Sequence, residues 1–282
     1  MVGPVHHDRG SDTACDPGVS AHVAWCEPRV VVGPARLTET DHTSLAFPAS
    51  GCRYRDRVAY WERASSIAGA VVWTNVTDGS DMWILPDGCM DIIWDGRSLL
   101  VAGPDTGPFL AHNATGTSYT AVRFPPGTGP SVFGVPAKAL RNQRVDLTDL
   151  WAPADVERLI DRLHSVDDVA SALEAVSAER LREAPVDPLL TEVVRLVDDG
   201  YLVAEVARTV GLSERQLHRR SLIAFGYGPK VLARILRLQR ALALARDGSS
   251  FAAAAVDSGY TDQAHLAREV RALAGAPLTQ LA

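Results

Sequence analysis

The chain has 282 residues, which is enough for two domains of ordinary size. Its formal net charge of −6, taken alone, argues against a nucleic-acid-binding protein. No charged-then-apolar leader opens the chain and no apolar run reaches about 18 residues, so we expect a cytoplasmic protein that does not cross a membrane.

The first part of the chain is rich in structure-breaking residues. Residues 1–53 carry no sustained hydrophobic periodicity and are repeatedly interrupted by glycine and proline. Such segments rarely hold regular secondary structure, so we expect a poorly ordered extension over residues 1–53. The run Arg29–Val32 is a candidate strand within it.

The pattern changes to that of β-strands over residues 54–150. These runs contain many β-branched and aromatic residues, and turn residues separate them. Asp95-Gly96 is a strong signal for a tight hairpin between two of the runs. The candidate strands are residues 69–76, 82–85, 90–94, 99–102 and 117–124. Short strands joined by tight turns predict a small antiparallel sheet or a partly open barrel.

Two charged residues, Asp91 and Arg123, fall inside these predicted strands. On an outer face they would be ordinary solvated side chains. Inside a barrel they would need partners, so they would pair with each other or hold a polar effector. Trp73, Trp83 and Trp94 could wall such a pocket, or they could simply belong to the hydrophobic core. These five residues are the candidate effector site.

Residues 151–186 have the spacing of two helices. Apolar residues recur at helical intervals in 154–163 and again in 167–176. The resulting helical hairpin could serve as an interdomain connector or as a dimer surface. The proline-containing stretch 183–188 then leads into a C-terminal domain over residues 187–282, whose first helix we expect at 188–198.

The C-terminal domain contains one short pattern twice, at residues 203–217 and at 250–266. In each copy a short apolar helix is followed by a glycine, a capping residue and a second helix, which is the helix-turn-helix pattern. The glycines supply the left-handed conformation of the turn, and the polar residues cap the second helix. These are Gly211 with Ser213, and Gly259 with Asp262.

A predicted helix of about 18 residues joins the two copies, and it would be about 27 Å long. A spacer of that length could hold two recognition helices roughly one DNA turn apart, about 34 Å. The segment 205–246 contains nine basic residues opposed only by Glu205 and Glu214, a local net charge of +7. Because this charge coincides with the motifs, phosphate contact is favoured in spite of the acidic chain.

The C-terminal arrangement resembles the DNA-binding domain of the AraC/XylS family of transcriptional regulators. The resemblance covers roughly the last 95 residues, and it is specific because both motifs and their linker fall in order at family spacing. The matching phrases are Val206-Ala207, Gly211-Leu-Ser213, Leu217-His-Arg219, Phe225-Gly-Tyr-Gly-Pro229, Arg237-Leu-Gln-Arg240-Ala241 and Ser258-Gly-Tyr-Thr-Asp-Gln263-Ala-His-Leu266. Residues 85–94, 101–105 and 122–124 also look like the N-terminal domain of one branch of this family, which implies a regulatory role.

The resemblance implies a set of DNA-contacting residues. The first recognition helix would begin at Ser213, and side chains on it, on the linker helix and on the second recognition helix would face DNA. The implied set is Ser213, Arg215, His218, Arg219, Lys230, Arg234, Arg237, Gln263, His265 and Arg268. The sequence departs from the family at Ser221 and Val270, where an aromatic ring is usual. We expect the Ser221 hydroxyl to bond back to the carbonyl of Leu217.

The signals for catalysis are weak. The β-rich region holds only His112, so a cluster of three or four metal ligands is not visible there. No nucleophile turn or glycine-rich phosphate loop is present, so we expect neither an enzyme nor a cofactor. A metal- or thiol-responsive regulator remains an alternative, because the chain has Cys15, Cys26, Cys52 and Cys89, although no two form a Cys-x-x-Cys pair.

Together these features predict an α+β protein of two domains, with an antiparallel sheet or partly open barrel followed by an all-α double helix-turn-helix domain. The expected function is a sequence-specific DNA-binding transcriptional regulator, controlled by a small molecule or by dimerisation through its N-terminal domain. Its expected partners are double-stranded DNA, a small-molecule effector and a second copy of the chain.

Overall fold

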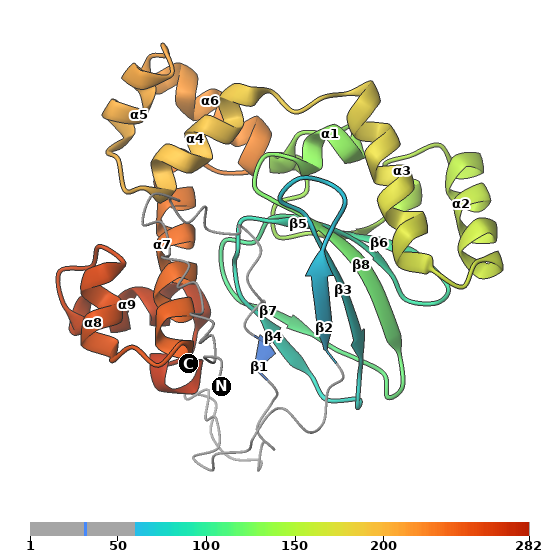
Figure 1. Ribbon diagram of the computed structural model, residues 1–282, viewed down its shortest axis with the longest axis horizontal. Coiled ribbons are helices and arrows are strands. Elements are labelled where there is room, and N and C mark those ends of the chain that lie inside the picture. The colour runs from blue at the N-terminus through green and yellow to red at the C-terminus, as the bar shows by residue number, and fades with distance from the viewer. Residues whose placement is uncertain (1–30, 33–59, 282) are drawn as a thin grey trace, which may run out of the picture.

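The computed structural model describes residues 31–32 and 60–281 (Figure 1). The extension predicted over residues 1–53 therefore lies outside the described residues, apart from strand β1 (Val31–Val32). This strand confirms the last two residues of the candidate at Arg29–Val32, and the first two lie outside the described residues. It pairs antiparallel with β4, so this short N-terminal segment joins the β-rich part of the chain.

Two antiparallel sheets form the β-rich part (Figure 1). The larger has six strands in the order β2-β3-β8-β5-β6-β9, and the smaller has three in the order β1-β4-β7. The six strands of the larger sheet in chain order are β2 (Trp61–Ala64), β3 (Val71–Val76), β5 (Met90–Trp94), β6 (Leu99–Ala102), β8 (Ser118–Phe124) and β9 (Arg144–Asp146). The smaller sheet adds β4 (Met82–Ile84) and β7 (Phe109–Ala111) to β1. The predicted antiparallel α+β fold is confirmed.

The hairpin between β5 and β6 turns at Asp95-Gly96, as the sequence predicts. One Asp95 carboxylate oxygen accepts hydrogen bonds from the backbone N–H of Arg97 at 2.8 Å and of Ser98 at 2.7 Å. Gly96 adopts φ +92°, a conformation that a side chain would disfavour. These local interactions fix the register of β5 and β6, and β5 in turn pairs with β8.

Three helices cover the larger sheet: α1 (Gly129–Phe133), α2 (Pro153–Ser165) and α3 (Val169–Glu183). Helix α2 buries Val156, Leu159 and Leu163, which recur every three or four residues and so share one face. This face packs into the same hydrophobic cluster as Ile92 and Val122 of the sheet. The predicted helices at 154–163 and 167–176 are confirmed, and both contribute residues to the core of the β-rich part.

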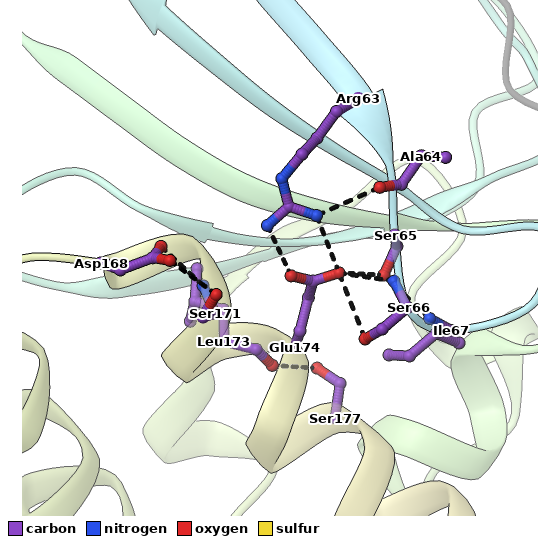
Figure 2. A network of polar contacts seen from close by, with 10 residues as sticks. All are labelled: Arg63, Ala64, Ser65, Ser66, Ile67, Asp168, Ser171, Leu173, Glu174 and Ser177. Atoms are coloured by element: carbon purple, nitrogen blue, oxygen red, sulfur yellow. Dashed lines mark hydrogen bonds and ion pairs between the residues drawn. The ribbon is translucent and has the colours of Figure 1, made fainter.

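A partly buried ion pair, in which Glu174 is the buried member, ties α3 to the edge of the larger sheet (Figure 2). The Glu174 carboxylate accepts hydrogen bonds from the Arg63 guanidinium at 2.6 and 3.1 Å, from the Ser65 hydroxyl at 2.6 Å and from the Ser66 backbone N–H at 2.7 Å. Burial alone would raise the pKa of Glu174, but these hydrogen bonds outweigh it and lower the pKa to about 2. The carboxylate is therefore charged at neutral pH and fully partnered.

The C-terminal part is entirely helical. Its helices are α4 (Pro188–Asp198), α5 (Val203–Thr209), α6 (Glu214–Phe225), α7 (Pro229–Arg246), α8 (Phe251–Asp257) and α9 (Gln263–Ala274). Helix α7 runs between the two helix-turn-helix motifs, which are α5–α6 and α8–α9 (Figure 1). The turn glycines Gly211 and Gly259 have φ +69° and +78°, as their sequence positions predict. Three short 3-10 turns, Ala137–Ala139, Leu147–Asp149 and Leu278–Gln280, complete the described elements.

The helical part packs directly against the β-rich part. The 3-10 turn at Ala137–Ala139 lies along α6, and Arg141 donates a hydrogen bond to the carbonyl of Gly226 at 3.4 Å. Gly127 lies so close to the Phe225 ring that an added Cβ would come within 3.0 Å of it. The segment between β4 and β5 reaches α7, where Gln239 donates to the carbonyl of Pro86 at 2.6 Å.

Candidate functional site

Helix α6 begins at a capping box. The Ser213 hydroxyl accepts from the backbone N–H of Gln216 at 3.3 Å, and the Gln216 side chain accepts from the backbone N–H of Ser213 at 2.9 Å. Two backbone donors that the helix leaves open are thereby satisfied, and the start of α6 is fixed. Ser213 therefore serves to position the helix.

The outer face of α6 carries three of the predicted contact residues, and all three side chains are exposed: Arg215, His218 and Arg219. The opposite face buries Leu217, which anchors the helix in the core of the first motif. Arg215 and His218 also line a groove together with Lys230 at the start of α7. The structure thus brings a linker-helix cation beside the recognition helix.

Helix α9 holds the predicted contacts of the second motif. The Asp262 carboxylate caps the helix by accepting from the backbone N–H of His265 at 2.7 Å. Gln263 and Arg268 are exposed, whereas the His265 ring is half-buried and packs edge-on against Tyr260 at a centroid distance of 5.3 Å. His265 therefore contributes to packing of the turn, and Gln263 and Arg268 offer the free donor groups.

The basic row of α7 is divided between two roles. Lys230 is exposed, but Arg234 donates to the Glu269 carboxylate of α9 at 2.8 Å and lowers the pKa of that group. The Arg237 guanidinium lies 4.4 Å above the centre of the Tyr260 ring. Arg234 and Arg237 thus tie α7 to the second motif, a use that the sequence pattern did not indicate.

The Ser221 side chain corrects one sequence-based expectation. Ser221 is fully buried, but its hydroxyl has no hydrogen-bond partner, so the expected bond to the Leu217 carbonyl is not formed. Ser177 of α3, also fully buried, does donate back to the carbonyl of Leu173 at 2.7 Å. Of these two buried helical serines, only Ser221 leaves its hydroxyl unsatisfied. The other departure from the family, Val270, is fully buried in the core of the second motif.

We expect Ser221→Ala to stabilise the protein by about 1 kcal/mol, because it removes an unsatisfied buried hydroxyl. The matched change Ser177→Ala removes a formed hydrogen bond in an equally buried helical position, so its effect should be less favourable by a similar amount. Chemical denaturation of the two variants and the parent measures both effects. A loss of stability in Ser221→Ala as large as that in Ser177→Ala would contradict this explanation.

A cavity of about 340 Å³ lies between the two sheets. The smaller sheet contributes residues of β4 and β7, and the larger sheet contributes residues of all its strands except β2. The lining is Tyr60, Trp73, Asn75, Met82, Ile84, Ile93, Leu100, Phe109, Leu110, Ala111, His112, Asn113, Tyr119, Arg123 and Arg144. It is mostly apolar, with a few polar and charged groups.

Arg123 and Asp91 face each other on neighbouring strands, β8 and β5. Both side chains are buried, and Arg123 Nε lies 3.7 Å from one Asp91 carboxylate oxygen. The other oxygen accepts a hydrogen bond from the Trp73 indole at 3.1 Å. A second carboxylate, that of Asp87, lies 3.8 Å from Arg123 Nε. The interpretation that Asp91 and Arg123 are solvated on an outer face is therefore wrong, and their mutual pairing is confirmed.

Of the three tryptophans predicted to line a pocket, only Trp73 lines the cavity. Trp94 lies in the hydrophobic core, edge-on to His164 at a centroid distance of 5.1 Å, and Trp83 lies on β4 opposite Leu110. Neither lines the cavity. Phe109 and Arg144 do, and the Arg144 guanidinium lies 4.1 Å above the Phe109 ring. Sequence reasoning missed both because their strands, β7 and β9, are only three residues long.

The described residues bear only partly on the metal- or thiol-responsive alternative. Within residues 31–32 and 60–281, no group of three or more His, Cys, Asp or Glu side chains could hold a metal ion. Cys89 is buried, whereas Cys15, Cys26 and Cys52 lie outside the described part. None of the helices described is long and apolar enough to span a membrane.

Comparison with known proteins gives matches in both parts of the chain. Residues 206–282 match a family described as a helix-turn-helix domain, and residues 70–146 match a domain of unknown function, DUF6597. No curated protein matches the chain.

Among solved structures, the chain is similar to ToxT from Vibrio cholerae O395, with 9% identity, coverage of 80% of this chain and 97% of that chain, and a TM-score of 0.39. A 1.65 Å structure of ToxT from the same species has 10% identity and a TM-score of 0.40, and the match covers 80% of this chain and 98% of that chain. A structure of ToxT bound to an unsaturated fatty acid has 11% identity and a TM-score of 0.39, and the match covers 79% of this chain and 84% of that chain. The family match over residues 206–282, together with the two motifs joined by α7, identifies the chain as a DNA-binding transcriptional regulator with an AraC-type helix-turn-helix domain.

Proposed function

We propose that this regulator reads a duplex DNA site with α6 and α9, and that a small molecule held in the cavity between the two sheets controls it. Residues 187–282 would form the DNA-binding domain. The cavity is the observation that carries the regulatory part of the proposal, since its volume of about 340 Å³ falls in the range of small-molecule sites, about 300–1,000 Å³.

The exposed side chains of the two recognition helices support the DNA-reading role. Arginine donates two hydrogen bonds to guanine, and glutamine can do the same with adenine. Arg215, Arg219 and Arg268 suit the first kind of contact, and Gln263 suits the second. Lys230 is exposed at the start of α7 and suits a phosphate.

The chemistry of the cavity supports an effector that is largely apolar and carries a polar or anionic group. Aliphatic and aromatic side chains from both sheets would cover its apolar surface. Arg123 and Arg144 would supply donors, and each is already oriented by a carboxylate, Asp91 for Arg123 and Asp105 for Arg144. Positioned donors of this kind give orientation and specificity in an otherwise apolar site.

An aromatic sulfonate dye, anilinonaphthalene sulfonate, tests the cavity because it combines an apolar ring system with one anion. We expect the folded parent to bind the dye and enhance its fluorescence. Ala111→Trp should remove most of this enhancement, because Ala111 lines the cavity and the indole would fill it. The control Ala114→Trp adds the same ring at an exposed position outside the lining. Equal enhancement in the two variants would show that the dye binds elsewhere and would remove the support for an effector site.

A further inference from the structure

The segment Leu85–Cys89 between β4 and β5, called here the β4–β5 loop, enters the helical part of the protein. Leu85 is almost fully buried, and it packs in the core of the second motif with Leu238 of α7 and Leu266 of α9. The carbonyl of the next residue, Pro86, accepts a hydrogen bond from Gln239 of α7 at 2.6 Å. The first half of the loop is therefore anchored to the second motif.

The second half of the loop touches the first motif. A Cβ added at Gly88 would lie 3.5 Å from the Tyr227 hydroxyl oxygen and 3.6 Å from a Leu232 methyl group. Tyr227 and Leu232 belong to the core of the first motif. One short loop from the β-rich part thus reaches the cores of both motifs.

The same loop is in contact with the wall of the cavity. The Asp87 carboxylate accepts from the backbone N–H of Cys89 at 2.9 Å, which holds the turn, and it lies 3.8 Å from Arg123 Nε. Arg123 lines the cavity and also pairs with Asp91. A group that changes the position of Arg123 from the cavity side would change the charge facing Asp87 at the same time.

The packing at the loop also contains an unsatisfied polar group. The Tyr227 hydroxyl is buried without a hydrogen-bond partner. Leaving such a group unpaired disfavours the docked arrangement, and separation of the loop from α7 would let water reach it. Apolar contacts and the Gln239 hydrogen bond hold the loop against the motifs, while the unpaired Tyr227 hydroxyl lowers the stability of this arrangement. Such a balance suits an element that changes position.

We propose that the β4–β5 loop sets the relative orientation of the two helix-turn-helix motifs, and that Arg123 couples this loop to the cavity through Asp87. The coupling rests on the proposed function, since it assumes that the cavity receives the effector. The orienting role of the loop does not need that assumption, because it follows from contacts with both motif cores. Two recognition helices bind one duplex site only when their spacing matches the DNA.

The orienting role is tested with Gly88→Ala against Gly96→Ala in the full chain. Gly88 and Gly96 have positive φ, +84° and +92°, so each change to alanine strains a turn in the β-rich part. An added Cβ at Gly88 meets Pro126 at 3.0 Å, so the loop must shift where it lies in van der Waals contact with the first motif, whereas at Gly96 nothing lies within 4 Å. The readout is binding to a duplex selected by the parent from a random pool, and to unselected duplex.

We expect Gly88→Ala to weaken binding of the selected duplex at least fivefold, the lower end of usual coupling between sites, and to leave unselected duplex nearly unchanged. Gly96→Ala should bind both as the parent does. Gln239→Ala, which removes the bond to Pro86 without backbone strain, should act in the same direction as Gly88→Ala. Parent-like binding by both Gln239→Ala and Gly88→Ala would overturn the orienting role.

The coupling is tested with Asp87→Asn against Asp95→Asn. Each carboxylate holds a turn through backbone N–H groups, and asparagine keeps an acceptor there, but only Asp87 faces Arg123. With the aromatic sulfonate bound, the parent and Asp95→Asn should change affinity for the selected duplex, while Asp87→Asn should bind the dye and not respond. A parent-like response in Asp87→Asn, or no response in a parent that binds the dye, would overturn the coupling. Failure of the Ala111→Trp comparison would instead overturn the effector site and leave the Gly88 result standing.

Discussion

Arg219→Ala is expected to relax sequence choice by about 1–3 kcal/mol, or roughly 5- to 150-fold, if Arg219 makes a two-bond contact to a base. Arg219 lies on the exposed face of α6, on the side opposite the buried Leu217. The affinity for the parent-selected duplex should fall by that factor, while the affinity for unselected duplex should fall much less. Titration of both duplexes at one fixed salt concentration measures the ratio.

Arg220→Ala is the matched control, because it removes the same charge from the next position of the same helix. Arg220 is exposed and forms an ion pair of 3.3 Å with Asp187 at the start of α4, and it is not among the predicted contact residues. Its loss should weaken the two duplexes by the same small factor through long-range attraction alone. If Arg219→Ala also weakened the two duplexes equally, Arg219 would contact phosphate and would not read a base.

The C-terminal helices could be predicted closely because their signals are local. Asp187 and Pro188 open α4, Gly228 and Pro229 open α7, and both glycine turns have the conformation that their positions require. Caps, turn glycines and apolar spacing act within one or two helical turns. A single sequence therefore contains nearly all the information that places these elements.

The uses of Arg234 and Arg237 could not be predicted from the same signals. Arg234 pairs with Glu269, which lies 35 residues further along the chain. Arg237 stacks on Tyr260, which belongs to the turn of the second motif. A row of arginines on one helix face looks the same in the sequence whether it meets phosphate or a neighbouring helix, and only tertiary packing separates the two cases.

The cavity was predictable only in part, for a related reason. Asp91 and Arg123 stood out as charges inside strands, but their partnership depends on the β5–β8 register, which places them opposite each other. Phe109 and Arg144 lie on strands too short to give an alternating pattern. Trp94 shows the opposite error, since its size and its strand position fit a pocket wall and a core residue equally well.

Glu174→Gln is expected to lower the free energy of unfolding at neutral pH by about 2 kcal/mol, the scale of hydrogen bonds to a buried charged group. The amide nitrogen of glutamine cannot accept a hydrogen bond, so donors from Arg63, Ser65 and Ser66 would lose acceptors in the network of Figure 2. Glu192→Gln is the matched control, because Glu192 also receives two hydrogen bonds from one arginine but is exposed on α4. Exposed pairs contribute little, so this change should leave stability nearly unaltered.

The effect of Glu174→Gln should also depend on pH in a defined direction. The folded-state pKa of Glu174 is lowered from 4.5 to about 2, so its contribution to stability is fully present above about pH 4.5 and is lost as pH falls toward 2. The stability difference between parent and variant should therefore be largest at neutral pH and should shrink in acid. Chemical denaturation of both proteins at pH 7 and at pH 3 measures this difference. A difference that stays constant between these pH values would show that the charge of Glu174 does not hold α3 to the sheet edge, and that its shape alone does.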